Sequence, residues 1–173
     1  MTSSRFGSPV HLARRFFTSL RSTPPPAADD AWAESKLLPG ESALWRRLSG
    51  SDRRHAVGVG RATAMLLGGE ASTDRAVLAA ALLHDVGKVE ARLGTVSRAA
   101  VTAWALAVGP ERLARGDGRA ARYLRHADLG AAMLSAAGSD PLTVQWTLEH
   151  HRPPEDWTVP QAVGEALKAA DDD

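Results

Sequence analysis

The sequence predicts an all-α fold, and three observations support this prediction. The chain has 173 residues, which is enough for one domain with a buried core. Its hydrophobic fraction is 44% but only 5% of its residues are aromatic, so most apolar residues are Ala, Leu and Val, which favour closely packed helices. Apolar residues recur at helical spacing between Gly and Pro breakers, and no β-type alternation or internal repeat is long enough to compete.

Three prolines, Pro24 to Pro26, separate an N-terminal region from the rest of the chain. Before them, residues 8–21 are predicted to form an amphipathic helix that Ser8 caps and Pro9 begins. Its apolar face holds Val10, Ala13, Phe16, Phe17 and Leu20, and its polar face holds His11, Arg14, Arg15, Thr18 and Arg21. We interpret this helix as one that docks on the protein's own core; a partner helix or a membrane-surface helix is the alternative. We therefore divide the chain into residues 1–40, with this helix and a Pro-rich linker, and a helical domain over residues 41–173.

Start and stop signals define the helices after the linker. The predicted ranges are 29–38, 41–48, 52–67, 73–83, 97–108, 119–136 and 141–150, with a last helix that begins at Pro160. The part from Ala76 to Leu83 is apolar nearly all round, which indicates burial. Residues 112–119 contain Gly116 and Gly118 and are predicted to form a loop.

Composition and charge exclude several classes of protein. The net charge is +1, from 21 basic and 20 acidic residues, so no overall field attracts nucleic acid or a membrane surface. The chain has no Cys, which excludes disulfides, thiolate catalysis and sulfur-rich zinc sites. No apolar run approaches the roughly 20 residues of a membrane span, and the N-terminus does not resemble a signal peptide. We expect a cytoplasmic protein with no membrane span and no nucleic-acid partner.

The histidines are the strongest functional signal. Five of the six lie in four predicted helical segments beside apolar sequence, namely His55, His84, His126, His150 and His151. His84 and Asp85 end the most apolar helix, and a buried carboxylate without a partner is costly. A divalent metal would satisfy Asp85 and His84 together, because a neutral imidazole is a good ligand for Fe, Mn, Ni or Zn. Four such segments in one chain favour a metal site over separate core histidines.

The segment from Leu83 to Lys88 reads Leu-His-Asp-Val-Gly-Lys and resembles the signature of the HD-domain superfamily of metal-dependent phosphohydrolases. That superfamily has a His, then a His-Asp pair, then a distant Asp. Here His55 precedes the pair by 84 − 55 = 29 residues, and Asp171 ends an apolar helix in Ala-Ala-Asp, with Asp172 and Asp173 out of phase. The resemblance covers about residues 44–171. It implies an HD-domain helical bundle over residues 41–173, with His55, His84, Asp85 and Asp171 as metal ligands.

The other histidines resemble the two-metal branch of this superfamily, which includes cyclic-dinucleotide phosphodiesterases. The resemblance implies a second ion held by His126 and His150, with Asp85 bridging both ions and His151 as a third ligand or a supporting group. The expected cofactor is therefore one or two divalent ions of Fe, Mn, Ni or Zn. The Gly-Tyr-Pro motif that follows the His pair in HD-GYP enzymes is replaced here by residues 152–157, which argues against cyclic di-GMP as substrate.

The basic residues suggest what the site binds. Lys88 matches a lysine that often contacts phosphate in HD hydrolases, so we expect Asp85 and Lys88 to be catalytic and Lys88 to bind substrate; a solvated cation is the alternative. Arg119, Arg122 and Arg125 recur every three residues, and we interpret Arg122 and Arg125 as substrate-binding, with a solvated basic face as the alternative.

The predicted function is a phosphohydrolase that cleaves a nucleotide or another small phosphoester, as a phosphomonoesterase or a phosphodiesterase, through a metal-activated water. An HD-type di-iron oxygenase and a non-catalytic ligand-binding HD sensor are the alternatives. The expected partner is the small phosphorylated substrate, and a homodimer is left open.

Overall fold

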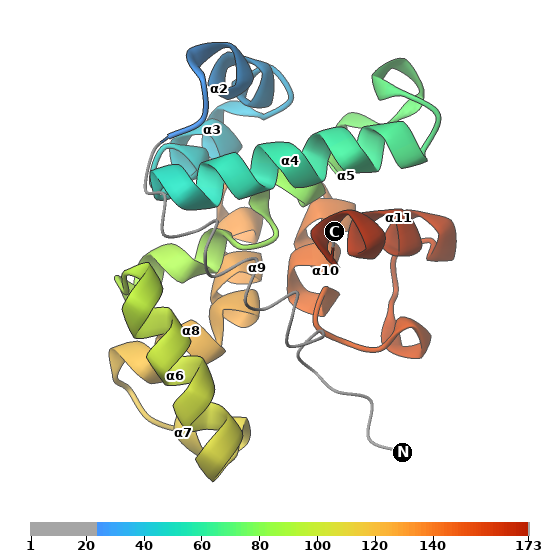
Figure 1. The fold of residues 1–173 in the computed structure, drawn as a ribbon. Coiled ribbons are helices and arrows are strands. Elements are labelled where there is room, and N and C mark those ends of the chain that lie inside the picture. The colour runs from blue at the N-terminus through green and yellow to red at the C-terminus, as the bar shows by residue number, and fades with distance from the viewer. Residues whose placement is uncertain (1–23, 173) are drawn as a thin grey trace.

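The structure is a computed structural model that describes residues 24–172, apart from the side chain of Thr95 (Figure 1). The described residues form helices joined by short loops and contain no strand, which confirms the all-α class. The α-helices are α2 Ala27–Glu34, α3 Pro39–Trp45, α4 Gly50–Leu66, α5 Arg75–Leu83, α6 Thr95–Val108, α7 Pro110–Ala114, α8 Arg119–Leu124, α9 His126–Ala136, α10 Pro141–Glu149 and α11 Gln161–Asp172. The 3-10 helices are η1 Glu70–Ser72, η2 Val86–Ala91 and η3 Pro154–Asp156. The helix predicted over residues 8–21 lies outside the described residues.

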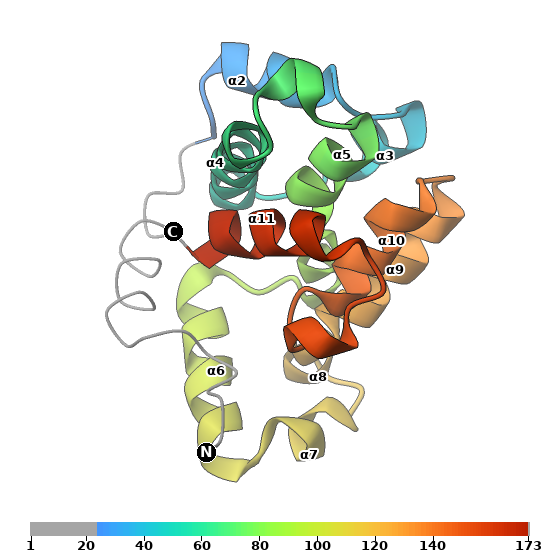
Figure 2. The ribbon, with the colours of Figure 1, turned by 90° about the vertical axis from the view of Figure 1, so that its right-hand side faces the viewer.

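The centre of the bundle is α5. Its first turn is capped by Asp74, whose side chain accepts a hydrogen bond from the Ala76 N–H (2.7 Å). Every residue from Ala76 to Leu83 is buried, which confirms the burial predicted for this segment. The helix packs against α4 and α10, and α11 lies against α4 (Figures 1 and 2). The chain therefore leaves α5 at His84 and Asp85 inside the protein, surrounded by other helices.

The first described helices pack on the same core. Ala33 of α2 and Trp45 of α3 are fully buried in one cluster with Leu82 and Leu83. The Trp45 indole N–H also donates a hydrogen bond to Asp30 (2.9 Å), which ties α3 to α2. Residues 27–45 thus share a core with the helices that follow, and the division of the chain at residue 40 stays a prediction.

Two predictions of secondary structure were wrong. The helix predicted over residues 119–136 is broken at Arg125 (φ −99°, ψ 19°) into α8 and α9. The sequence has no Gly or Pro at this point, and the break occurs where η2 packs against both helices. The loop predicted over residues 112–119 begins as helix α7, because Pro110 occupies a first-turn position and favours a helix start.

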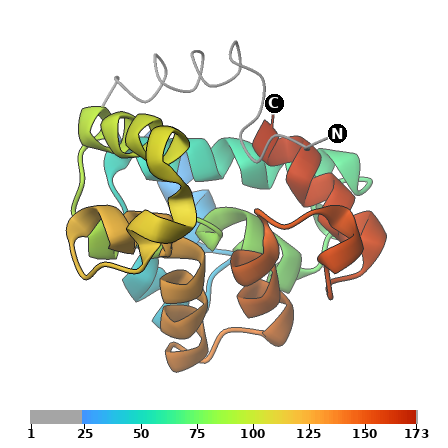
Figure 3. The same cartoon turned by 90° about the horizontal axis from the view of Figure 1, so that it is seen from below.

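Peripheral helices complete the bundle. From below, α6 and α11 lie on opposite sides of the molecule (Figure 3), and the main contacts of α6 are with α7 and α8. No helix among the described residues is both long enough and apolar enough to cross a bilayer.

Candidate metal centre

The fold brings all seven predicted metal ligands to the middle of the bundle. Three helices and the segments after α5 and α10 supply them: His55 on α4, His84 and Asp85 after α5, His126 on α9, His150 and His151 after α10, and Asp171 on α11. These residues are up to 116 positions apart in sequence, as for His55 and Asp171. Only the tertiary fold can place them side by side.

The first group consists of His55, His84 and Asp171. One ligand atom of each lies within 4.8 Å of the other two. Asp171 Oδ1 is 2.9 Å from His55 Nε2 and 3.5 Å from His84 Nε2. Two imidazole nitrogens therefore converge with a carboxylate oxygen, which is a suitable ligand set for a divalent cation.

The second group consists of His126, His150 and His151, whose ligand atoms also lie within 4.8 Å of one another. The Nε2 atoms of His126 and His151 are 3.1 Å apart, so two ring nitrogens face each other. This group has three imidazoles and no carboxylate of its own. A cation held there would depend on a neighbouring acid for charge balance.

Asp85 lies between the two groups and supplies that acid. Its Oδ2 atom is 3.5 Å from His84 Nε2 in the first group. Its Oδ1 atom is 3.4 Å from His126 Nε2 and 3.8 Å from His150 Nε2 in the second. The two oxygens of one carboxylate thus face different histidine groups, which is the arrangement of a carboxylate that can bridge two ions.

Three of the imidazoles are oriented in the same way by a backbone carbonyl three residues earlier in the chain. The distances from Nδ1 to the carbonyl oxygen are 2.9 Å for His84 and Ala81, 2.7 Å for His126 and Tyr123, and 2.8 Å for His150 and Thr147. A carbonyl oxygen only accepts hydrogen bonds, so each Nδ1 carries the proton. The lone pair of each ring is then on Nε2, the atom that points into the centre.

Two buried atoms indicate that the centre fits a metal. The Nε2 atoms of His84 and His150 are buried and have no hydrogen-bond partner among the described residues. Buried polar atoms in native proteins almost always have a partner. Two neighbouring ring nitrogens without one therefore require an explanation. A divalent ion of the Fe, Mn, Ni or Zn type accepts imidazole and carboxylate donors together, and the residues present fit one or two such ions.

The electrostatics of the centre agree with this reading. Burial alone would raise the pKa of Asp85, but Lys88 and the imidazoles of His84 and His126 hold that pKa well below its usual range. Burial and the neighbouring histidines lower the pKa of His150 well below its usual range. Part of His151 is exposed, but desolvation of its ring and the nearby His126 lower its pKa to about 3. A neutral imidazole and an ionised carboxylate are the forms that bind metal.

The environment of His84 is different. Burial lowers the pKa of His84, but the carboxylates of Asp85 and Asp171 outweigh it and raise the pKa above its usual value. These two acids thus attract positive charge to the space beside the ring. A proton on His84 and a bound cation are alternative ways to supply that charge, and metal binding would displace the proton.

Two glycines allow the centre to form. A Cβ on Gly87 would lie 1.9 Å from the carbonyl oxygen of His126 and 2.6 Å from the backbone nitrogen of Gly130. A Cβ on Gly130 would lie 3.1 Å from the backbone nitrogen of Gly87. The backbones of η2 and α9 therefore touch, which sets Asp85 and Lys88 beside His126. Sequence reasoning placed Gly87 in the signature but did not predict its role.

Sequence reasoning also missed two supporting acids. Glu149 is buried next to the His pair and accepts hydrogen bonds from the Thr158 N–H (2.7 Å) and hydroxyl (2.8 Å), which holds the chain after α10. Asp52, one turn before His55 on α4, forms a two-point ion pair with Arg98 of α6 (2.6 and 2.9 Å). For Glu149 the sequence did contain a signal, namely a Glu beside two histidines at the end of an apolar helix.

The predicted substrate-binding residues lie in different settings. Lys88 forms an ion pair with Asp85 through Nζ and Oδ2, so its ammonium group reaches the centre. Arg122 is exposed on α8, and Arg125 lies at the break before α9 and donates a hydrogen bond to the Gly116 carbonyl (3.1 Å). The break removes the single helical face on which these two arginines were expected, and their role in substrate binding stays a prediction.

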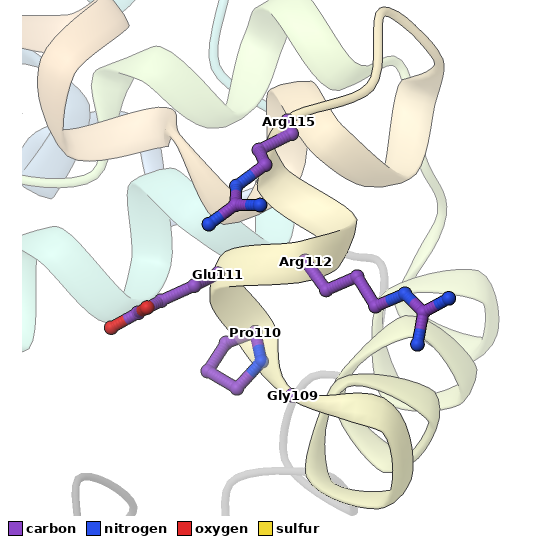
Figure 4. A pocket seen from close by; sticks show the side chains of 5 residues that line it. All are labelled: Gly109, Pro110, Glu111, Arg112 and Arg115. Atoms are coloured by element: carbon purple, nitrogen blue, oxygen red, sulfur yellow. The ribbon is translucent and has the colours of Figure 1, made fainter.

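A separate pocket lies at the turn between α6 and α7 (Figure 4). Its lining residues are Gly109, Pro110, Glu111, Arg112 and Arg115, and the side chains of Glu111 and Arg112 point in different directions. None of the predicted site residues contributes to it. The candidate site is therefore the histidine and aspartate centre and not this pocket.

The all-α bundle thus places two histidine groups around one central aspartate, a set of residues that could hold a metal ion. Comparison with known families finds a match to the HD domain over residues 53–172. This match spans more than half of the chain, and the chain belongs to the HD-domain family. The HD domain is typical of metal-dependent phosphohydrolases and implies binding of a divalent metal. Neither the comparison with curated proteins nor that with solved structures returns a significant match.

Proposed function

We propose that this protein is a phosphohydrolase that uses one or two divalent ions to cleave a nucleotide or another small phosphoester. The observation that carries the proposal is the position of Asp85, whose two oxygens face separate histidine groups at 3.4 to 3.8 Å. His55, His84, Asp171 and Asp85 would hold one ion, and His126, His150 and His151 would hold the second together with Asp85. When bound, such ions lower the pKa of a water molecule and neutralise charge on phosphoryl oxygens.

The chain's own residues would orient the substrate. Lys88 is part-buried and reaches Asp85, so its ammonium group is positioned to bind an anion at the centre. Arg122 and Arg125 are further candidates for residues that bind the outer part of a substrate.

The di-iron oxygenase alternative would use the same ligands. The cation at Lys88 favours the phosphohydrolase, because an ammonium group at the centre matches the negative charge of a phosphate group. To test the function, purified protein is loaded separately with Mn²⁺, Fe²⁺ and Ni²⁺ and assayed with a panel of phosphomonoesters and phosphodiesters. Turnover of a phosphoester that depends on the metal supports the proposal, and oxygen consumption without phosphate release would overturn it.

We expect two metal ions per chain in protein prepared with excess Mn²⁺ or with Fe²⁺ under anaerobic conditions. His126→Ala is expected to lower this number to one, because His126 is in the group without a carboxylate of its own. Elemental analysis gives the count. Asp172→Asn is the matched control: it alters an exposed acid beside Asp171 that pairs with Lys168, and it should leave two ions bound. Saturation at one ion, unchanged in His126→Ala, would contradict the two-ion proposal.

Lys88→Ala is expected to weaken turnover of the substrate and to leave the metal content unchanged. Loss of a desolvated, charge-assisted contact costs about 1.5–3 kcal/mol, so kcat/KM should fall by a factor of roughly 10 to 150. Steady-state kinetics and elemental analysis on the same preparation measure both quantities. Lys168→Ala, which removes a surface lysine paired with Asp172, should have no effect. If kcat/KM is the same in Lys88→Ala as in the wild type, Lys88 does not bind the substrate.

A further inference from the structure

Helix α6 has an apolar stripe that faces solvent. Val96, Ala100, Ala103 and Ala107 are all exposed, and their spacing of four, three and four residues puts them on one side of the helix. Trp104, 53% exposed, and Leu106, 59% exposed, flank the stripe. Exposed apolar patches of this kind in a folded protein are commonly covered by another segment or by a partner.

The position of α6 in the bundle leaves this stripe uncovered by the described residues. The helix lies at the edge of the molecule (Figures 1 and 2), and its main contacts are with α7 and α8. Ala105 is its only fully buried residue among those described. The side of α6 that carries Ala105 and Arg98 faces the bundle.

The chain enters the described structure close to the first turn of α6. The Arg54 guanidinium donates a hydrogen bond to the carbonyl oxygen of Pro24 (2.8 Å), and Pro25 is buried. Two residues before Arg54, Asp52 forms the ion pair with Arg98 in the first turn of α6. Both contacts are made by the N-terminal part of α4, so the described chain begins at the end of α4 that also contacts the first turn of α6.

The segment before this point matches the stripe in length and pattern. Residues 8–21 comprise 14 residues, as does α6, and at about 1.5 Å per residue each helix is roughly 21 Å long. The apolar residues of the segment include Phe16 and Phe17, whereas the stripe is mainly alanine. Large side chains on one helix against small ones on the other allow two helices to pack closely.

We propose that residues 8–21 form a helix that packs antiparallel along the exposed stripe of α6. With Arg21 set at the first turn of α6, this register pairs Leu20 with Val96, Phe16 with Ala100 and Ala13 with Ala103. The polar face, with Arg14 and Arg15, is then directed to solvent. This N-terminal strap joins the edge helix α6 to the end of α4 that precedes His55, and it does not depend on the proposed function.

The absence of cysteine from the chain makes a cross-linking test unambiguous. Full-length Ala13→Cys/Ala103→Cys protein is expected to form a disulfide within one chain under mild oxidation. The matched control is Arg15→Cys/Ala103→Cys, because Arg15 lies on the opposite face of the predicted helix and should cross-link at least about ten times more slowly. Non-reducing electrophoresis and peptide mass spectrometry identify the product. Equal rates for the two pairs, no disulfide at all, or a disulfide between two chains would each overturn the proposal; the last would mean that a second copy covers the stripe.

A second measurement does not need new disulfides. In the wild-type chain, trypsin should cleave after Arg14 and Arg15 slowly, and in Ala103→Glu, which places a charge in the stripe, at least about ten times faster. Met65→Glu introduces the same charge at an exposed residue of α4, away from the stripe, and should not change the rate. Circular dichroism checks that both variants remain folded. Cleavage at the same rate in all three proteins would overturn the proposal.

Discussion

Asp85→Asn is expected to lower phosphoester hydrolysis at least about a thousand-fold, which corresponds to roughly 4 kcal/mol of transition-state stabilisation. Asparagine keeps the size of the side chain, and its amide oxygen can still accept a hydrogen bond from Lys88. It removes the single negative charge that lies between the two histidine groups. An amide oxygen cannot balance the charge of two divalent ions, so metal binding and activity should be lost together.

Kinetics and elemental analysis on the same sample test this expectation. Asp172→Asn makes the same chemical change at an exposed position and should retain both activity and metal. The far-UV circular dichroism of Asp85→Asn should remain largely helical, because α5 is held by its apolar residues and removal of the metal also removes a buried charge. Activity within tenfold of the wild type would place the active site elsewhere in the protein.

Gly87→Ala is expected to have the second largest effect, and on the folded structure itself. The added Cβ would lie 1.9 Å from the His126 carbonyl oxygen and 2.6 Å from the Gly130 nitrogen, and both of these atoms belong to the backbone. A flexible side chain could move away, but a helix backbone that is packed against α10 cannot do so without moving α9. We expect unfolding free energy to fall by about 3 kcal/mol or more, the upper range for overpacking.

Urea unfolding monitored by circular dichroism measures this loss. Gly58→Ala is the matched control, since Gly58 is an exposed residue within α4 whose Cβ would meet no atom within 4 Å. There alanine should leave stability unchanged or raise it by up to about 1 kcal/mol, because alanine favours helix more than glycine does. If the two variants have the same stability, the contact between η2 and α9 is not as tight as the structure indicates.

Much of the fold was predictable because helices depend on local patterns. The Asp74 cap and the unbroken apolar run to Leu83 define α5 by themselves, and the structure confirms that helix and its burial. The break at Arg125 was not predictable in this way. The sequence around that point is helix-compatible, and the break coincides with a tertiary contact: η2, which is distant in the chain, packs against both α8 and α9.

For the candidate site, too, some features were predictable from the sequence and others depended on tertiary contacts. The sequence by itself determined which residue types are available, because imidazoles and carboxylates in apolar segments are costly unless they are hydrogen-bonded, paired or bound to a cation. The signature from His84 to Lys88 identified the HD family that the family match confirms. Only the tertiary structure decided that Asp85 directs one oxygen to each histidine group, that backbone carbonyls turn three Nε2 atoms inward, and that Arg125 contacts the Gly116 carbonyl. These are relations between atoms on separate helices, and they depend on how closely the helix backbones approach, as at Gly87.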